Sequence, residues 1–492
     1  MQSKQPTWKP SNDDVVNVLL DQSPWQINGK VPAAWAFDVE RPLAKFLWNR
    51  LKQDKPRRYQ LILGPRRVGK TTAMYQTIRR LLAAKVDNTR VWRLSLDHPY
   101  LMGIPLETIV DLVIKSSRAT IEKPAYLFLD EVVYASQWDL WLKTFYDDVR
   151  PVCITASSSS TAALREGRLE SGVGRWDEQY LTPYLFSEYL CLVNEPNEIK
   201  VESSLANTIA GLATHPFNFE QLAARRRKYV LTGGFPELLI DASKANEDEQ
   251  TMLLKSQRTL RNDAVERAIY KDIPHAFGVD NPLLLEKMLY TLAGQVAGLL
   301  SPITLCKKLE NLSQPTFDRY LSYLERAFLV FTLPNYSGSE SSKQRRGRKL
   351  YFVDGAVRNA ALQRGLAPMS DDTEMGLYVE NLVAGHLFAL SQQNQVRLYH
   401  WRDKEEEVDL VYDHPTEPMA FEVASKNHKR RGVLSFMDRY PKFKGRCYMI
   451  SEHVPFVMPE KQFDGVGTIP LDAFLLAVST QAEKGLQTNL LA

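Results

Sequence analysis

One segment, from Tyr59 to Arg80, constrains the fold of this chain more than any other part of its sequence. Its first five residues are largely apolar and predict a short strand, and a helical pattern resumes at Lys70. The turn between them has the spacing G-x-x-x-x-G-K-T, which is typical of a loop that binds phosphate groups. The expected phosphate-binding residues are Gly64, Pro65, Arg66, Arg67, Val68, Gly69, Lys70, Thr71 and Thr72.

The chemistry of this loop explains its residue types. Gly64 and Gly69 allow backbone conformations that a Cβ atom would forbid. Amides of the loop and of the helix N-terminus then face phosphate oxygens. Lys70 is expected to reach the β- and γ-phosphates and Thr71 to ligate Mg²⁺. A chance match in a glycine-containing turn is the alternative, but the strand before and the helix after are the required context. ATP with Mg²⁺ is therefore the expected ligand.

A second motif follows a predicted strand at 125–129, where apolar residues run into Asp130 and Glu131. Ligands of open parallel sheets collect where strands end, so these acids are expected beside the phosphate-binding loop. We expect Asp130 to hold Mg²⁺ and Glu131 to polarise the attacking water. A buried strand that happens to end in acids is the alternative.

Other polar residues follow the next predicted strand, 152–156. Ser157 or Ser158 is expected to sense the γ-phosphate, and Ser158 is preferred, although a serine-rich helix cap fits nearly as well. Arg165, Arg168 or Arg175 is expected to approach the γ-phosphate, in cis or from a neighbouring subunit, and Arg175 is preferred. Exposed loop charges are the alternative for all three. A fifth strand is predicted at 180–184.

Composition sets few further limits. The 62 basic and 58 acidic residues give a net charge of +4, which argues neither for nor against nucleic acid. The four cysteines form no C-x-x-C pair, which fits a reducing cytoplasm and predicts no zinc site. The N-terminus has no apolar signal-peptide core and no run of 18 apolar residues occurs, so neither secretion nor a membrane partner is expected.

Residues 276–365 follow the order helix, helix, helix, strand, basic loop, strand, which predicts a winged helix. In DNA-binding versions the third helix enters the major groove and the loop contacts phosphate groups. A winged helix used only for protein packing is the alternative. The expected DNA contacts are Arg319 on the helix and, in the loop, Arg345, Arg346, Arg348 and Lys349.

Three acids stand in a third pattern near the C-terminus. Glu380 lies on a predicted helix, Asp409 on one predicted strand and Glu422 on the next. This arrangement is the core of the PD-(D/E)xK nucleases, in which carboxylates gather Mg²⁺. The lysine expected at 424 is Ala424, although Lys426 would share its face if the strand continued. The acids therefore predict either a second metal site or a degenerate site that serves as a scaffold.

With GPRRVGKTT, LDEVVYASQW, ITASSS, GRW, LTGGFPELL, RKLYFVDGAVR, GLYVENLV and EVDLV…FEV in order, the chain resembles a known family. It is similar, from about residue 40 to 480, to the bacterial and archaeal AAA-type ATPases that carry a C-terminal domain of unknown function, near the STAND-type ATPases. The resemblance implies ATP hydrolysis, a winged helix and a nuclease-like C-terminal fold. The chain departs from the family pattern at two positions. Val133 stands where the family has glutamine after D-E-I, and Ala424 stands where it has lysine after E-V. The residues that match the family motifs are Lys70, Thr71, Asp130, Glu131, Ser158, Arg175, Glu380, Asp409 and Glu422.

We therefore expect an α/β fold: a P-loop AAA-like parallel-sheet domain, a helical lid, a winged helix and a C-terminal restriction-endonuclease-like domain. The predicted ranges are 1–50 for an N-terminal extension, 51–195 for the ATPase domain, 196–275 for the lid, 276–365 for the winged helix and 366–492 for the nuclease-like domain. Three functional hypotheses remain open. They are an ATP-hydrolysing protein that acts with duplex DNA, in genome maintenance or defence; a STAND-like switch or scaffold for a protein partner, with a changing homo-oligomeric state; and an ATP-gated nuclease.

Overall fold

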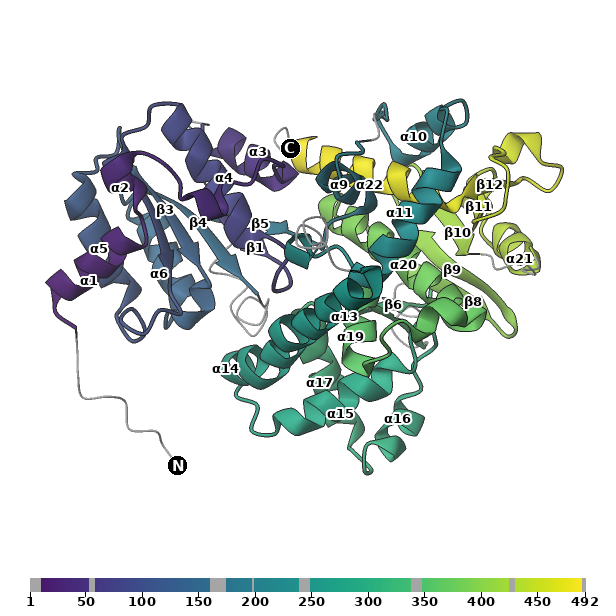
Figure 1. Cartoon of the computed structure of the whole chain (residues 1–492). Helices are drawn as coiled ribbons and strands as arrows, with labels where there is room; N and C mark the ends of the chain where they lie inside the picture. Colours follow the sequence, from purple (N-terminus) through teal and green to yellow (C-terminus); the bar gives the residue numbers. More distant parts are fainter. Residues whose placement is uncertain are drawn as a thin grey trace. The chain divides into compact units, whose positions relative to one another are not determined.

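The computed structural model describes residues 10–52, 58–159, 174–196, 199–238, 248–337, 347–423 and 430–488. It divides into two compact units, Met1–Gly64 with Gly69–Leu181, and Pro65–Val68 with Thr182–Ala492. Each unit has its own sheet and helices (Figure 1). The finer division of the second unit into lid, winged helix and C-terminal domain stays a prediction.

A five-stranded parallel sheet in the order β2-β3-β4-β1-β5 forms the centre of the first unit (Figure 1). Three of the five strands, β1, β3 and β4, begin where the apolar runs predicted them. The strands are β1 Tyr59–Leu63, β2 Val91–Ser95, β3 Ala125–Asp130, β4 Val152–Ser158 and β5 Trp176–Tyr180. The helices are α1 Asn12–Asp21, α2 Trp25–Asn28, α3 Pro42–Leu51, α4 Lys70–Ala83, α5 Leu106–Ser117 and α6 Trp138–Asp147, with short 3₁₀ turns at Ala33–Trp35, Asn88–Arg90 and Val132–Tyr134.

The prediction for the fifth strand was wrong by four residues. The strand covers Trp176–Tyr180 and pairs with β1, so the predicted segment 180–184 begins where β5 ends. Pro183 in that segment has no amide hydrogen to donate to a sheet. The observed strand includes Asp177 and Glu178 because it lies at an edge of the sheet, where one side of the strand stays accessible to solvent.

In the predicted N-terminal extension, residues 12–28 fold as α1 and α2 and cover the other edge of the sheet. The hydroxyl of Ser23 accepts a 2.9 Å hydrogen bond from Arg93 N. The indole of the fully buried Trp25 donates to the carbonyl of Val91 at 2.8 Å. An open strand edge carries unpaired backbone groups, and side chains of this segment pair with those of β2.

The second unit begins with helices and continues into a β-hairpin. The predicted helix, helix, helix, strand, strand order of residues 276–365 is confirmed as α15, α16, α17, β6 and β7 (Figure 1). The helices are α9 Phe186–Leu192, α10 Leu205–Leu212, α11 Phe219–Thr232, α13 Glu249–Leu260, the π-helical segments Arg261–Glu266 and Ala268–Asp272, α14 Ile273–Phe277, α15 Pro282–Ala293, α16 Pro302–Lys308, α17 Gln314–Arg326 and α19 Gly355–Leu362. The hairpin strands are β6 Val330–Pro334 and β7 Arg348–Phe352.

A mixed sheet in the order β12-β11-β10-β9-β8 follows. Residues of α20 and α22 share one buried apolar core with Phe421 and Ile450 of this sheet, and Phe436 of α21 packs with Val408 in another. The helix and strands predicted to carry the three acids are confirmed. The elements are the 3₁₀ turn Ala367–Ser370, α20 Asp372–Gln393, β8 Leu398–Asp403, β9 Glu406–Tyr412, β10 Met419–Val423, α21 Arg431–Arg439, β11 Cys447–Ser451, β12 Val466–Pro470 and α22 Leu471–Thr488, with short 3₁₀ turns at Pro441–Phe443 and Pro459–Lys461.

Candidate nucleotide-binding site

The turn after β1 is built around two glycines. A Cβ atom on Gly64 would lie 2.1 Å from the carbonyl oxygen of Leu181, so only glycine fits there. Gly69 has φ +89° directly before α4, in the left-handed region that glycine tolerates. Lys70 is the first residue of α4, is buried, and donates a 2.9 Å hydrogen bond from Nζ to the carbonyl of Gly64. The local geometry is that of the predicted phosphate-binding loop.

The phosphate-binding motif and the acidic motif meet at the end of β3. The hydroxyl of Thr71 donates to Asp130 Oδ2 at 2.7 Å, and the hydroxyl of Ser157 donates to Asp130 Oδ1 at 2.5 Å. The guanidinium of Arg93 on β2 also pairs with Asp130. Burial alone would raise the pKa of Asp130, but the charge of Arg93 and these hydrogen bonds outweigh burial and hold that pKa below its ordinary value. Asp130 is therefore an ionised carboxylate beside Thr71.

Glu131 lies next to Asp130, but its side chain contacts a different serine. Its backbone is in the left-handed region, with φ +53°, and its amide donates to the hydroxyl of Ser157 at 3.2 Å. Its carboxylate Oε2 accepts a 3.0 Å hydrogen bond from the hydroxyl of Ser159. The side chain is only partly buried, so a water molecule can reach it.

The three serines at the end of β4 have different positions. Ser157 and Ser159 contact the two acids, as strand alternation requires for residues two apart. Ser158 is buried, and its carbonyl accepts a 3.3 Å hydrogen bond from the amide of Gly64. Of the two serines predicted as γ-phosphate sensors, Ser157 is the better placed, because its hydroxyl is bonded to Asp130.

The position of Arg175 does not support a role in cis. It precedes β5, and its neighbour Trp176 pairs with Tyr59, at the start of β1, whereas the phosphate-binding loop follows the end of β1. Five strand residues at about 3.3 Å each separate the two edges by about 16 Å. The guanidinium of Arg175 pairs with Asp147 at 2.8 Å. A role in trans stays a prediction, and Arg165 and Arg168 lie outside the described residues.

The segment Pro65–Val68 belongs to the second unit, and both of its arginines form ion pairs with acidic residues of that unit. Arg66 donates to Asp272 Oδ1 at 2.6 Å. Arg67, which has φ +68°, pairs with Glu237 and Asp263. The backbone of these residues, and not their charged ends, is what the loop motif uses for phosphate.

These residues fit ATP and Mg²⁺. The hydroxyl of Thr71 and the ionised Asp130 are hard oxygen donors that already converge to 2.7 Å, and such donors suit Mg²⁺. Gly64 and Gly69 keep the loop free of Cβ atoms where the backbone must approach phosphate oxygens. Arg93 and Ser159 were not singled out from the sequence. Ser159 had a signal, since it lies two residues after the predicted Ser157, whereas Arg93 shows its role only through the pairing of β2 with β3.

The predicted DNA contacts have different outcomes. Lys349 is not a loop contact, because it is 4% exposed and its ammonium group pairs with Glu380 and Asp409. Arg348 is partly exposed and pairs with Asp318 at 2.6 Å. Arg319 is exposed on α17. Arg345 and Arg346 lie outside the described residues.

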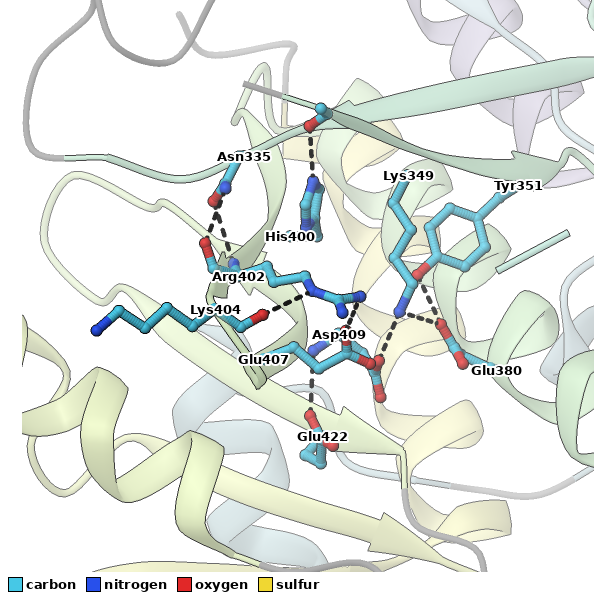
Figure 2. Close-up of polar contacts among 11 residues, drawn as sticks. Asn335, Lys349, Tyr351, Glu380, His400, Arg402, Lys404, Glu407, Asp409 and Glu422 are labelled. Carbon is cyan, nitrogen blue, oxygen red and sulfur yellow. Dashed lines mark hydrogen bonds and ion pairs between the residues drawn. The ribbon is translucent and has the colours of Figure 1, made fainter. Parts of the chain in front are cut away.

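The three C-terminal acids come together but not around a metal position (Figure 2). Within the described ranges, no group of three or more histidine, cysteine or acidic residues is arranged to hold a metal ion. The second metal site predicted at Glu380, Asp409 and Glu422 is not preformed here, because the ammonium group of Lys349 lies between two of the acids. Ala424 and Lys426 lie outside the described residues.

Comparisons with known proteins match three separate segments of the chain. Residues 56–190 match a family described as AAA domain, and residues 223–367 and 375–458 match two families described as domains of unknown function. The chain is 28% identical over 398 residues to the uncharacterised protein MJ1637 of Methanocaldococcus jannaschii, covering 78% of this chain and 79% of that protein. An uncharacterised protein of Haemophilus influenzae is 21% identical, and the match covers 80% of this chain and 90% of that protein. Residues 56–190, most of which lie in the first unit, are therefore similar to an AAA domain.

Among solved structures, the Aeropyrum pernix ORC2 protein in its ADP form is similar at 14% identity, with a TM-score of 0.33, over 71% of this chain and 99% of that one. A TM-score this low supports no functional comparison. In the described part of the chain, no helix has the length and apolar character needed to cross a membrane.

Proposed function

We propose that this chain hydrolyses ATP with Mg²⁺ and that duplex DNA is the ligand with which it acts. The observation that carries the ATPase part is the 2.7 Å hydrogen bond between Thr71 and Asp130, residues from two motifs that lie 59 positions apart. A phosphate-binding loop after one strand and an acid at the end of another strand of the same sheet are the parts from which P-loop ATPases build their site.

Each side chain then has one task. Lys70 and the loop amides hold the phosphate groups, while Thr71 and Asp130 hold the magnesium ion, which when bound stabilises negative charge on the phosphate oxygens. Glu131 orients the attacking water and accepts its proton. Ser157 keeps Asp130 in place through its 2.5 Å hydrogen bond.

The DNA part of the proposal is supported by α17 and the loop that follows β6. Arg319 is exposed on α17, the third helix of the predicted winged helix. The sequence places Arg345 and Arg346 in the basic loop. Arginines that neutralise phosphate groups make binding weaken as salt rises.

The test is steady-state ATP hydrolysis with and without duplex DNA, with Glu131→Gln as the inactive control. Stimulation by DNA is expected in the wild type, and it should fall when Arg319, Arg345 and Arg346 are changed to glutamine. The exposed Lys115 on α5 provides a matched control, because Lys115→Gln removes a charge outside the predicted winged helix. Salt-insensitive or absent DNA binding would overturn the DNA part and leave the ATPase part standing.

A second candidate, an ATP-gated switch or scaffold for a protein partner, is favoured by the closed state of the C-terminal acids. Asp409 and Glu422 are 2% and 3% exposed, which leaves no access for a phosphodiester and speaks against the nuclease alternative. The switch predicts slow turnover that DNA does not change, together with a shift in oligomeric state when ATP is added. Light scattering that shows one mass in all nucleotide states would contradict it.

A further inference from the structure

A buried ion cluster in the second unit joins the β6–β7 hairpin to the C-terminal sheet (Figure 2). Lys349 comes from β7, yet its Nζ lies 2.7 Å from Glu380 Oε1 on α20 and 2.7 Å from Asp409 Oδ1 on β9. The lysine is 4% exposed. An uncompensated charge is costly to bury, so Lys349 and the two acids depend on one another.

Other hydrogen bonds fix the acids around the lysine. Asp409 Oδ2 accepts from the amide of Val423 at 3.0 Å, and Glu422 Oε2 accepts from the amide of Asp409 at 3.2 Å. The hydroxyl of Tyr351, two residues after Lys349, donates to Glu380 Oε1 at 2.8 Å. The carboxylates are thus arranged for hydrogen-bond donors at 2.7–3.2 Å, whereas Mg²⁺ needs six oxygen ligands at about 2.1 Å.

The electrostatics agree with this arrangement. Burial, together with repulsion from Asp409, raises the pKa of Glu380 to about 7, against the attraction of Lys349. Burial alone would lower the pKa of Lys349, but attraction by the acids, first of all Asp409, outweighs it and raises that pKa well above its ordinary value. The two acids repel each other, and the ammonium group between them is the cation that keeps them together.

Both strands of the hairpin are attached to β8 near this cluster, β6 just after its last residue and β7 just before its first (Figure 2). The amide of Tyr336, after β6, donates to the carbonyl of His400 at 2.6 Å. The ring of His400 is 3.0 Å from the carbonyl of Gly347, before β7. The Asn335 side chain pairs with the backbone of Arg402 at 3.0 and 3.2 Å. The hairpin strands are therefore fixed to the C-terminal sheet.

The metal site that the nuclease pattern implies does not fit these residues, and the mismatch has one cause. We propose that Lys349 is an internal counter-ion that takes the place of a divalent cation between Glu380 and Asp409, and thereby fixes the β6–β7 hairpin to the C-terminal sheet. The position where the pattern expects a lysine holds Ala424. The cluster's lysine comes instead from a separate element, and it binds the acids themselves. On this view the C-terminal domain is a scaffold to which the β6–β7 hairpin is fixed through the lysine of β7.

The test is iron-mediated hydroxyl-radical cleavage of the full chain, which cuts the backbone near bound Fe²⁺. In the wild type no fragments should arise within 400–423. Lys349→Met, which keeps the length of the side chain and removes its charge, should gain such fragments, and Mn²⁺ or Mg²⁺ should suppress them. Arg348→Met, the neighbouring cation that pairs with Asp318, is the matched control and should gain none.

A second measurement follows folding rather than cleavage. Mn²⁺ should raise the unfolding temperature of Lys349→Met and leave the transition of the wild-type second unit unchanged. If Lys349→Met does not fold even with Mn²⁺, the double variant Lys349→Met/Glu380→Gln is used in its place. This variant removes one carboxylate together with the ammonium group. Local cleavage in the wild type would overturn the proposal, and so would a folded lysine variant that gains neither cleavage nor stabilisation.

Discussion

At the residue scale, Ser157 differs from Ser158 in what its hydroxyl contacts. Ser157 donates to the carboxylate of Asp130 and accepts from the amide of Glu131. A hydrogen bond to a charged group contributes about 1.5–3 kcal/mol, so Ser157→Ala should slow ATP hydrolysis about 10- to 100-fold, as Asp130 loses its orientation. Ser158→Ala serves as the control and should have a smaller effect on kcat. Equal losses in the two variants, or a larger loss for Ser158→Ala, would restore Ser158 as the sensor.

His386 makes the second unit sensitive to acid. Its Nε2 accepts a 3.1 Å hydrogen bond from the amide of Phe186, and its Nδ1 is 2.9 Å from the carbonyl of Leu382, so the ring is neutral with the proton on Nδ1. Burial lowers its pKa to about 4, whereas an unfolded histidine has a pKa of about 6.5. The contribution of His386 to stability is complete above pH 6.5 and is lost as pH falls towards 4, in total roughly 3 kcal/mol.

Urea unfolding of the second unit between pH 7.5 and 4 checks this prediction. His386→Gln, whose amide stays neutral, should lose part of the acid dependence that the wild type shows below pH 6.5. His453→Gln is the control, because the side chain of His453 is 69% exposed. If the difference in unfolding free energy between wild type and His386→Gln does not change with pH, the ring is not buried in its neutral form.

At the element scale, two motifs far apart in the sequence pack against each other in the second unit. The amide of Gly234 donates to Asp354 Oδ2 at 2.8 Å, and a Cβ atom on Gly234 would lie 2.3 Å from the carbonyl oxygen of Tyr184. Burial raises the pKa of Asp354, although hydrogen bonds from the amides of Gly234 and Ala356 oppose this. The turn at Gly234 therefore packs against the N-terminus of α19.

Gly234→Ala should therefore lower the stability of the second unit by about 1–3 kcal/mol, because backbone atoms of Tyr184 would have to move. Gly211 in α10 is the matched control, since a Cβ atom there meets nothing within 4 Å. Gly211→Ala should raise stability by about 0.5–1 kcal/mol through the better helix propensity of alanine. Chemical denaturation of both variants measures the two effects, and equal stabilities would contradict the close approach.

The elements that the sequence predicted well are those whose signal is local. The runs of β1, β3 and β10 are apolar and short, and their limits match the prediction to within one residue. The misplaced β5 is an edge strand with acidic residues, whose pairing depends on β1 and not on its own pattern. Lys349 was misread for a related reason: its basic neighbours 345–348 suggested an exposed loop, while its partners come from α20 and β9.

At the scale of the whole molecule, the two units have separate sheets and separate apolar cores. The core that joins α20 and α22 to the C-terminal sheet lies entirely in the second unit, and the phosphate-holding Lys70 and Thr71 belong to the first. Chains with more than one compact unit commonly unfold in more than one step. We therefore expect two thermal transitions in the full chain.

ATP with Mg²⁺ should raise the transition of the first unit more than that of the second, since Lys70, Thr71 and Asp130 belong to the first unit and only the loop segment Pro65–Val68 belongs to the second. At a free ligand concentration of 100 times Kd the gain is about 2.7 kcal/mol. Scanning calorimetry can assign the two transitions with one variant for each unit. Gly234→Ala should lower the transition temperature of the second unit. Trp25→Ala, which removes a buried side chain from the first unit, should lower the transition temperature of that unit, with a loss of about 3–5 kcal/mol in its unfolding free energy. Lys70→Ala should abolish the response to ATP and leave both transitions in place. A single transition, or two that ATP raises together, would mean that the units fold as one cooperative body. Nucleotide binding would then be linked directly to the hairpin and the C-terminal sheet.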